Sequence, residues 1–130
     1  MNQLNDSQFD FIVRNELKAR ELLIADGLNQ NLKIGDLNDK SFIDSVINRG
    51  EYDVLLHIAG IHLSLNLVEP AVKNRIKRLI LVHTTGIYSK YTAAGEMYRI
   101  IEKKIEDMIE GTDIQLTYLR PTMIYGNIHD

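Results

Sequence analysis

The chain has 130 residues, which suits one domain, and its 45% of hydrophobic residues is ordinary for a folded protein. Its formal net charge of -3 gives no basic surface for nucleic acid and no polybasic membrane anchor. Cysteine is absent, which excludes disulfides and thiolate metal sites, and no apolar run is long enough to span a bilayer or resembles a signal peptide, so we expect a cytoplasmic protein.

In the first half of the chain, short apolar runs alternate with helical patterns. We expect a strand at residues 9–13, a helix at 16–25 and a short strand at 32–34. A second helix follows, for which Asp39 or Ser41 provides the cap and Gly50 the end.

The second half continues the same alternation with stronger signals. Residues 52–58 form a nearly continuous apolar run, which is typical of a strand that is covered on both faces. After it we expect a helix at 65–77 with Pro70 in its first turn, and a strand at 78–83. A helix at 95–110 with one apolar stripe and a strand at 114–119 complete the pattern.

This order predicts an α/β fold. Alternating strands and helices with short connections favour a Rossmann-like, three-layer arrangement, in which a parallel sheet of about five strands carries crossover helices on both faces. Each strand ends in small or polar residues, and ligands bind at that edge of open α/β sheets. Turn chemistry is the better explanation of any one such junction, but five junctions on one rim favour a binding site.

Three segments resemble blocks of a known family. They are YDVLLHIAG at 52–60, EPAVKNRIKRLILVHTTGIY at 69–88 and LRPTMIYG at 119–126. In this order they resemble the extended and atypical short-chain dehydrogenases/reductases, the NAD-dependent epimerase/dehydratase-like proteins, over residues 9–126. The resemblance implies a partial NAD(P)-binding Rossmann-like domain over residues 1–130 that acts on a small-molecule substrate.

The resemblance assigns one group of residues to the adenosine half of the cofactor. Asp36 and Leu37 resemble the acidic-Leu pair that meets the adenine ring, and Ala59 and Gly60 resemble the backbone that packs beside the ribose. Arg14 follows the strand at which such folds select the cofactor, where an arginine accepts the extra phosphate of NADP. Arg14 therefore favours NADP over NAD, although a solvated loop arginine is an equal alternative.

A second group belongs to the reacting end. Thr84 and Thr85 resemble the Ser/Thr pair whose hydroxyl orients the substrate carbonyl, with Thr84 beside the cofactor and Thr85 in the catalytic role. Pro121 and Thr122 resemble residues that line the nicotinamide side of the pocket. The implied chemistry is hydride transfer at a carbonyl or alcohol carbon, with Thr85 and a tyrosine polarising the oxygen.

The expected Tyr-Lys pair of the family is altered in this sequence. Tyr98 is the natural proton donor, but the position four residues later is Glu102, and Lys103 is turned away from the tyrosine by the helical rotation. A carboxylate beside a tyrosine raises the pKa of the phenol, so ordinary Tyr-Lys chemistry is in doubt. Tyr88 and Tyr91 lie nearer the threonine pair and are alternatives, while Tyr98 itself is a candidate for a packing role.

The family's glycine-rich turn, which holds the pyrophosphate, has no counterpart here. We therefore expect a truncated product, a fragment or one half of a split protein. Three functions stay open: an NAD(P)-dependent oxidoreductase or epimerase, a non-catalytic NADP-binding sensor, or a module that works only with a partner. Its exposed sheet edge is expected to allow pairing with another chain, including homo-oligomers.

The histidines suggest two further classes of site. His57, His62 and His83 lie at or after buried strands, but no carboxylate accompanies them at a spacing typical of metal sites. We therefore expect no metal site, and we expect these histidines to be bonded to the backbone at the strand ends. No nucleophile-elbow motif with a Ser-His-Asp order is visible, which argues against hydrolase chemistry.

Overall fold

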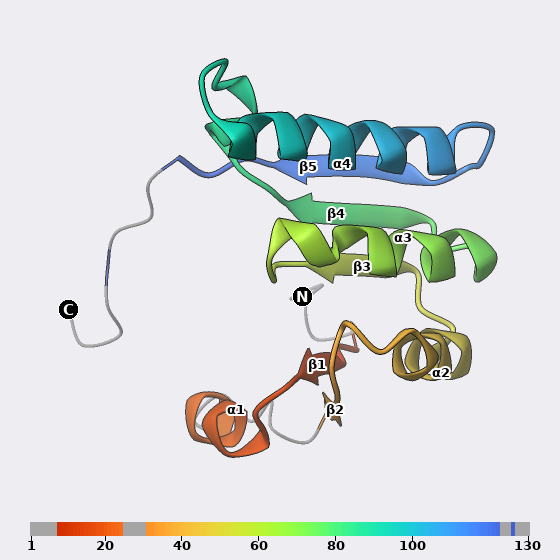
Figure 1. The fold of residues 1–130 in the computed structure, drawn as a ribbon. Helices are drawn as coiled ribbons and strands as arrows, with labels where there is room; N and C mark the ends of the chain where they lie inside the picture. The colour runs from red at the N-terminus through yellow and green to blue at the C-terminus, as the bar shows by residue number, and fades with distance from the viewer. Residues whose placement is uncertain (1–7, 25–30, 123–125, 127–130) are drawn as a thin grey trace, which may run out of the picture.

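The computed structural model describes residues 8–24, 31–122 and 126, and it has the α/β architecture that the sequence predicts (Figure 1). Strands and helices alternate along the chain. The elements are β1 (Phe11–Val13), α1 (Glu16–Leu23), β2 (Leu32–Ile34), α2 (Lys40–Gly50), β3 (Val54–His57), the short 3-10 helix η3 (Ile61–Leu63), α3 (Ser64–Lys73), β4 (Arg78–Val82), the 3-10 helix η4 (Thr85–Tyr88), α4 (Ala93–Ile109) and β5 (Gln115–Leu119).

All described strand pairs are parallel, but they form two sheets instead of the single sheet that was expected. One sheet has the order β1-β2 and the other β3-β4-β5. In the larger sheet Val54 pairs with Arg78 and Arg78 with Gln115, so the three strands begin in register and end at the same edge. Figure 1 shows β1 and β2 set apart from β3.

Helices α2, α3 and α4 form one layer that supplies most of the core. Ile43 of α2 packs with Leu67 of α3, and Val68 on the other side of α3 packs with Leu81 of β4 and Ile105 of α4. All five side chains are at most 3% exposed. The predicted apolar stripe of the 95–110 helix is confirmed in part: Ile101, Ile105 and Ile109 hold α4 on the sheet, whereas Met97, Ile100 and Met108 are exposed.

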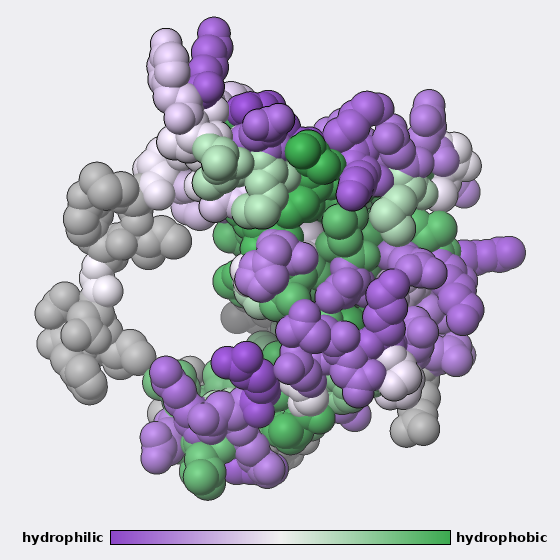
Figure 2. Space-filling view, viewed as in Figure 1, coloured by the Kyte–Doolittle hydropathy of each residue, from purple (hydrophilic) through white to green (hydrophobic). Residues whose placement is uncertain are grey.

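Only one face of the larger sheet is covered within the described residues, which differs from the expected helices on both faces. Leu79 and Leu81 of β4 are fully buried under α3 and α4. The alternate residues of the neighbouring strand are open, with Val54 50% and Leu56 54% exposed. Because successive strand side chains point to opposite faces, β3 presents aliphatic side chains on an uncovered face. Hydrophobic side chains also show between the hydrophilic ones in the space-filling view (Figure 2).

The ends of the helices follow local signals, with two differences from prediction. Asp39 caps α2 by accepting a hydrogen bond from the backbone N–H of Phe42, as expected. Gly50 is the last residue of α2, and Glu51 after it takes the left-handed conformation with φ 48°. Pro70 lies well inside α3 and not in its first turn, because the helix already begins at Ser64, directly after η3.

Candidate functional site

The candidate site lies at the edge where the strands end. Parallel strands that start in register bring the residues after β3, β4 and β5 to one rim, so Ala59, Thr84 and Pro121 lie along it. Arg14 and Asp36 follow β1 and β2 at the corresponding ends of the smaller sheet. These five positions belong to the set that the sequence assigned to cofactor binding.

The loop after β2 is anchored to the rest of the rim. Asn66 in the first half of α3 donates a side-chain hydrogen bond to the carbonyl oxygen of Leu37 at 2.9 Å. Asp36 accepts hydrogen bonds from both the backbone and the side chain of Asn38, and these bonds, with a smaller contribution from Arg14, hold the pKa of Asp36 below its usual value. The Asp36 carboxylate is therefore ionised and lies near Arg14.

The turn after β3 is closed by two histidines. The buried His57 ring contacts the carbonyl oxygen of Gly60 through Nε2 at 3.2 Å, which is the strand-end backbone bond that was predicted. Burial lowers the pKa of His57, with His83 and His62 adding to the effect, so the ring is neutral at pH 7. The His62 ring lies so close to Gly60 that a Cβ there would meet it at 2.6 Å. A side chain at Gly60 would therefore displace the exposed ring of His62.

The turn after β4 is held by its own cap and by α4. Thr84 accepts a hydrogen bond from the backbone N–H of Gly86 at 3.1 Å and so fixes the start of η4. Arg99 of α4 donates to the carbonyl oxygens of Ile87 at 2.7 Å and Ser89 at 3.0 Å. The segment that carries Thr85 is thus clamped onto the first turns of α4.

Gly95 allows this close approach. A Cβ at Gly95 would lie 2.6 Å from the carbonyl oxygen of Ser89 and 3.0 Å from that of Gly86. The same contact places the half-buried ring of Tyr98 near the turn, 3.4 Å from the position of a Cβ on Gly86. The structure therefore brings Tyr98 to the turn that contains Thr85.

Lys103 does not join this group. Its ammonium pairs with Asp107 at 2.6 Å on the solvent side of α4, and its side chain is 71% exposed. Tyr98 and Lys103 thus point to different surroundings, as the helical rotation predicts. Of the alternative tyrosines, Tyr91 is 97% exposed and Tyr88 is 71% exposed.

Glu102 is the centre of a buried polar network that the sequence did not reveal. Its carboxylate accepts hydrogen bonds from Nδ1 of His83 at 2.8 Å and from both terminal nitrogens of Arg120 at 2.6 and 2.7 Å. Nε2 of His83 in turn contacts the hydroxyl of Ser64 at 2.9 Å. The network joins α3, β4, α4 and β5, and Glu102 faces this network and not Tyr98.

The charge of the network follows from its contacts. Burial alone would raise the pKa of Glu102, but the hydrogen bonds from Arg120 and His83 outweigh it and hold the pKa below its usual value. With Glu102 ionised, Nδ1 of His83 donates to it, and in the neutral ring Nε2 accepts from Ser64. Ser64 is 0% and His83 4% exposed, so this Ser-His-carboxylate arrangement is closed to substrate and does not form a hydrolase site.

Arg120 connects the network to the rim. One of its nitrogens donates to the carbonyl oxygen of Thr84 at 3.4 Å, which ties the end of β5 to the end of β4. Its guanidinium also lies over the ring of Tyr118 at 4.8 Å and that of Tyr88 at 5.7 Å. One feature of the sequence points to this network: Glu102 falls on the same helical face as the buried Ile105, which indicates a buried carboxylate.

The rim fits two parts of a dinucleotide better than the third. Arg14 and Asp36 offer charge and hydrogen bonding at one end, and Ala59 and Gly60 are exposed. At the other end, Tyr98 lies near Gly86 in the turn that contains Thr85. Among the described residues, no glycine-rich turn leads from a strand into a helix at this edge, so the described rim provides no such cradle for the pyrophosphate. The described part of the chain also gathers no group of metal-ligating side chains.

The comparisons agree with this fold. No family model matches the chain, and no curated protein matches it. A solved structure of Pen from Bacillus thuringiensis matches with a TM-score of 0.68 at 16% identity, over 90% of this chain and 43% of that one. A triphenylmethane reductase from Citrobacter sp., complexed with NADP(H), matches with a TM-score of 0.64 at 22% identity, over 84% of this chain and 38% of that one.

A third structure, a GDP-L-fucose synthetase from Naegleria fowleri, matches with a TM-score of 0.56 at 15% identity, over 92% of this chain and 51% of that one. The chain thus spans about half or less of the length of these neighbours. The likeness shows a Rossmann-like α/β fold. None of the helices in the described segments is both long and apolar enough to cross a membrane.

Proposed function

We propose that the chain forms part of the cofactor site of an NAD(P)-dependent oxidoreductase or epimerase of the short-chain dehydrogenase type. The observation that carries this proposal is the rim itself. The predicted positions after all five strands lie at the strand ends of a parallel α/β fold, where such folds bind dinucleotides. One of the solved neighbours is described with NADP(H) bound, which supports a nicotinamide cofactor as the ligand class.

Each rim residue has a role in this proposal. Arg14 binds the additional phosphate of NADP, which makes NADP the preferred cofactor, while Asp36 and Leu37 meet the adenine ring. Ala59 and Gly60 let the backbone approach the ribose, once the exposed ring of His62 moves away from Gly60.

At the reacting end, a bound nicotinamide would donate a hydride to the substrate carbon or accept one from it. Thr85 donates a hydrogen bond to the substrate oxygen, and Tyr98, held beside the same turn, is the proton donor. Thr84, Pro121 and Thr122 line the nicotinamide side. Lys103, which pairs with Asp107, lies outside this arrangement and does not support Tyr98.

The test is an NADPH fluorescence titration of the chain with an Arg14→Ala variant and a Lys18→Ala control, an exposed cation on the next helix. We expect weak, saturable binding at about submillimolar concentration, since the pyrophosphate contacts are incomplete, and binding weakened about tenfold by loss of Arg14. Lys18→Ala should leave the affinity unchanged. Equal weakening by both variants would contradict a specific phosphate contact.

A second candidate function is an NADP-binding sensor or partner-dependent module without catalysis. It is favoured by the network around Glu102, because the position four residues after Tyr98 is occupied by a carboxylate that is committed to His83 and Arg120. The position one turn after Tyr98 therefore holds no lysine. Tyr98→Phe separates the two: it should abolish carbonyl reduction by an assembled enzyme and leave a sensor's NADPH affinity and signal unchanged.

A further inference from the structure

The turn that carries Thr85 is held by two arginines. Arg99 of α4 donates to two of its carbonyl oxygens, at 2.7 and 3.0 Å. Arg120, at the end of β5, donates to the carbonyl oxygen of Thr84 at 3.4 Å. The turn is therefore attached to α4 at its far end and to the end of β5 where it begins.

The guanidinium of Arg120 is itself fixed by Glu102. Its two terminal nitrogens donate to the two carboxylate oxygens at 2.6 and 2.7 Å, a bidentate geometry that sets both distance and orientation. The side chain of Glu102 is 5% exposed and that of Arg120 is 20% exposed. The rings of Tyr88 and Tyr118 also lie against the guanidinium, at 5.7 and 4.8 Å. Arg120 is therefore held in one position, from which it reaches Thr84.

The same carboxylate holds the residue before Thr84. Nδ1 of His83 donates to Glu102 at 2.8 Å, and the backbone N–H of His83 donates to the carbonyl oxygen of Leu119 at 2.8 Å. Since His83 directly precedes Thr84, the carboxylate and its arginine are bonded to two consecutive residues at the end of β4. These bonds form a closed ring, so the carboxylate cannot shift without shifting the start of the turn.

Thr85 follows these anchored residues. Within the described segments its side chain makes no hydrogen bond, whereas the hydroxyl of Thr84 accepts one from the backbone N–H of Gly86. The ring of Tyr98 approaches the same turn, 3.4 Å from the position of a Cβ on Gly86. Tyr98 and Glu102 lie one turn apart on α4. The helix that presents Tyr98 therefore also anchors, through the carboxylate and its arginine, the turn that presents Thr85.

Resting on the proposed function, we propose that Glu102 and Arg120 are positioning residues for the reacting end. They set the position of Thr85 relative to Tyr98 through their bonds to the end of β4, and they touch neither cofactor nor substrate. The carboxylate four residues after Tyr98 thus serves the reacting end by holding the turn, although it faces away from the phenol.

A purely stabilising network is the alternative, and it makes a different prediction. If the network only stabilises the fold, the molecules of a variant that remain folded keep the same turn. If the pair positions the turn, a folded variant has an altered turn. The measurement must therefore report on the turn in the folded protein and not on the fraction that is folded.

Arg120→Lys is the variant for this test, because lysine keeps the charge but cannot reproduce the two parallel bonds to Glu102. Two NMR measurements without cofactor report on the turn. One is the nuclear Overhauser effect between the Tyr98 ring and the α-protons of Gly86, and the other is hydrogen exchange of the Gly86 amide, which bonds to Thr84. We expect the Overhauser effect to be lost and the exchange to be about tenfold faster. Glu102→Gln, which breaks the same paired bonds from the other side, should give the same changes.

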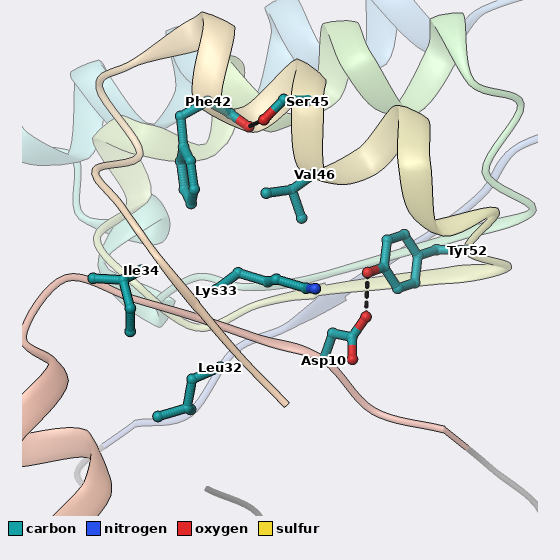
Figure 3. A pocket seen from close by; sticks show the side chains of 8 residues that line it. All are labelled: Asp10, Leu32, Lys33, Ile34, Phe42, Ser45, Val46 and Tyr52. Carbon is teal, nitrogen blue, oxygen red and sulfur yellow. Dashed lines mark hydrogen bonds between the residues drawn. The ribbon is translucent and has the colours of Figure 1, made fainter. Parts of the chain in front are cut away.

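Two control variants separate positioning from stability. Arg78→Lys changes a matched arginine at the opposite end of β4, where it bonds to the side chain of Gln115. Val46→Ala removes aliphatic atoms from a hollow of about 430 Å³ that is lined mainly by α2 and β2 and by none of the turn residues (Figure 3). It should lower the stability of the fold. Both controls should leave the Overhauser effect and the exchange of Gly86 unchanged.

Two results would overturn the proposal. One is an unchanged turn in Arg120→Lys or in Glu102→Gln. The other is the same change of the turn in Val46→Ala, which would make it an effect of lower stability. NADPH titration of the same proteins tests the proposed function separately. An altered turn in Arg120→Lys, together with a wild type that binds no NADPH, would refute the proposed function and leave the positioning of the turn intact. NADPH binding with an unaltered turn would do the reverse.

Discussion

Replacement of Glu102 by glutamine tests the buried network most sharply. The substitution keeps the size of the side chain but removes the charge that Arg120 and His83 share. Removal of one partner from a buried ion pair costs about 3–5 kcal/mol, and the side chain of Arg120 keeps 20% exposure, so we expect about 3 kcal/mol. For a domain of this size this lowers the melting temperature by about 10 °C.

The pH dependence gives an independent check of the same pair. The pKa of Glu102 is lower in the folded protein than in the unfolded chain, so its ionisation stabilises the fold above the unfolded pKa of about 4.3. This stabilisation is lost as the pH falls through the folded pKa. The difference between the wild type and Glu102→Gln should therefore be constant from about pH 7 to 5 and shrink at more acid pH.

The assay is urea unfolding followed by circular dichroism across this pH range. Glu106→Gln, one turn further along α4 with an exposed side chain, is the matched control and should have little effect. Two results would contradict this account of the buried network. One is that Glu102→Gln lowers the free energy of unfolding no more than Glu106→Gln does. The other is that the loss of free energy caused by Glu102→Gln stays the same when the pH is lowered below about 5.

Three further predictions concern separate parts of the chain. Asp39→Ala removes the cap of α2 and should lower the melting temperature by about 3 °C in thermal unfolding, whereas Asp39→Asn, which keeps an accepting oxygen, should not. Lys103→Ala should leave unfolding and NADPH affinity unchanged, because its pair with Asp107 is exposed; a clear loss of affinity would instead place Lys103 in the site. Burial, together with the hydrogen bond to Asp10, raises the pKa of Tyr52 to about 12. Spectrophotometric titration should find one tyrosine with this raised pKa, and Asp10→Asn should lower the pKa of that tyrosine. An unchanged titration midpoint in Asp10→Asn would contradict the hydrogen bond between Tyr52 and Asp10.

Local patterns were sufficient for the order of the elements. The apolar run at 52–58 became β3, part of the predicted stripe of the last helix became the core face of α4, and Asp39 capped α2 as its side chain allows. These features depend on periodicity and on contacts within a few residues. The start of α3 at Ser64 is within one residue of the prediction, but Pro70 lies inside the helix and not in its first turn, and the helix ends at Lys73, before the expected end at 77.

Features that depend on distant contacts could not be predicted in the same way. The position of Glu102 on the face of Ile105 indicates a buried carboxylate, but the sequence does not indicate that Ser64, His83 and Arg120 are its partners, since they come from separate parts of the chain that only packing brings together. The division into two sheets was also not predictable. It depends on which strands pair with each other, whereas the pattern of apolar residues in a strand indicates which face is buried and not which strand lies beside it.

The most direct test of the central claim, that the strand ends form part of a nicotinamide cofactor site, is an NMR titration of the isotope-labelled chain with NADPH. We predict saturable shifts of amides at the strand ends, at Arg14, Asp36, Gly60 and Thr85, and none on the outer side of α4. Shifts confined to other surfaces, or none up to millimolar NADPH, would contradict the account.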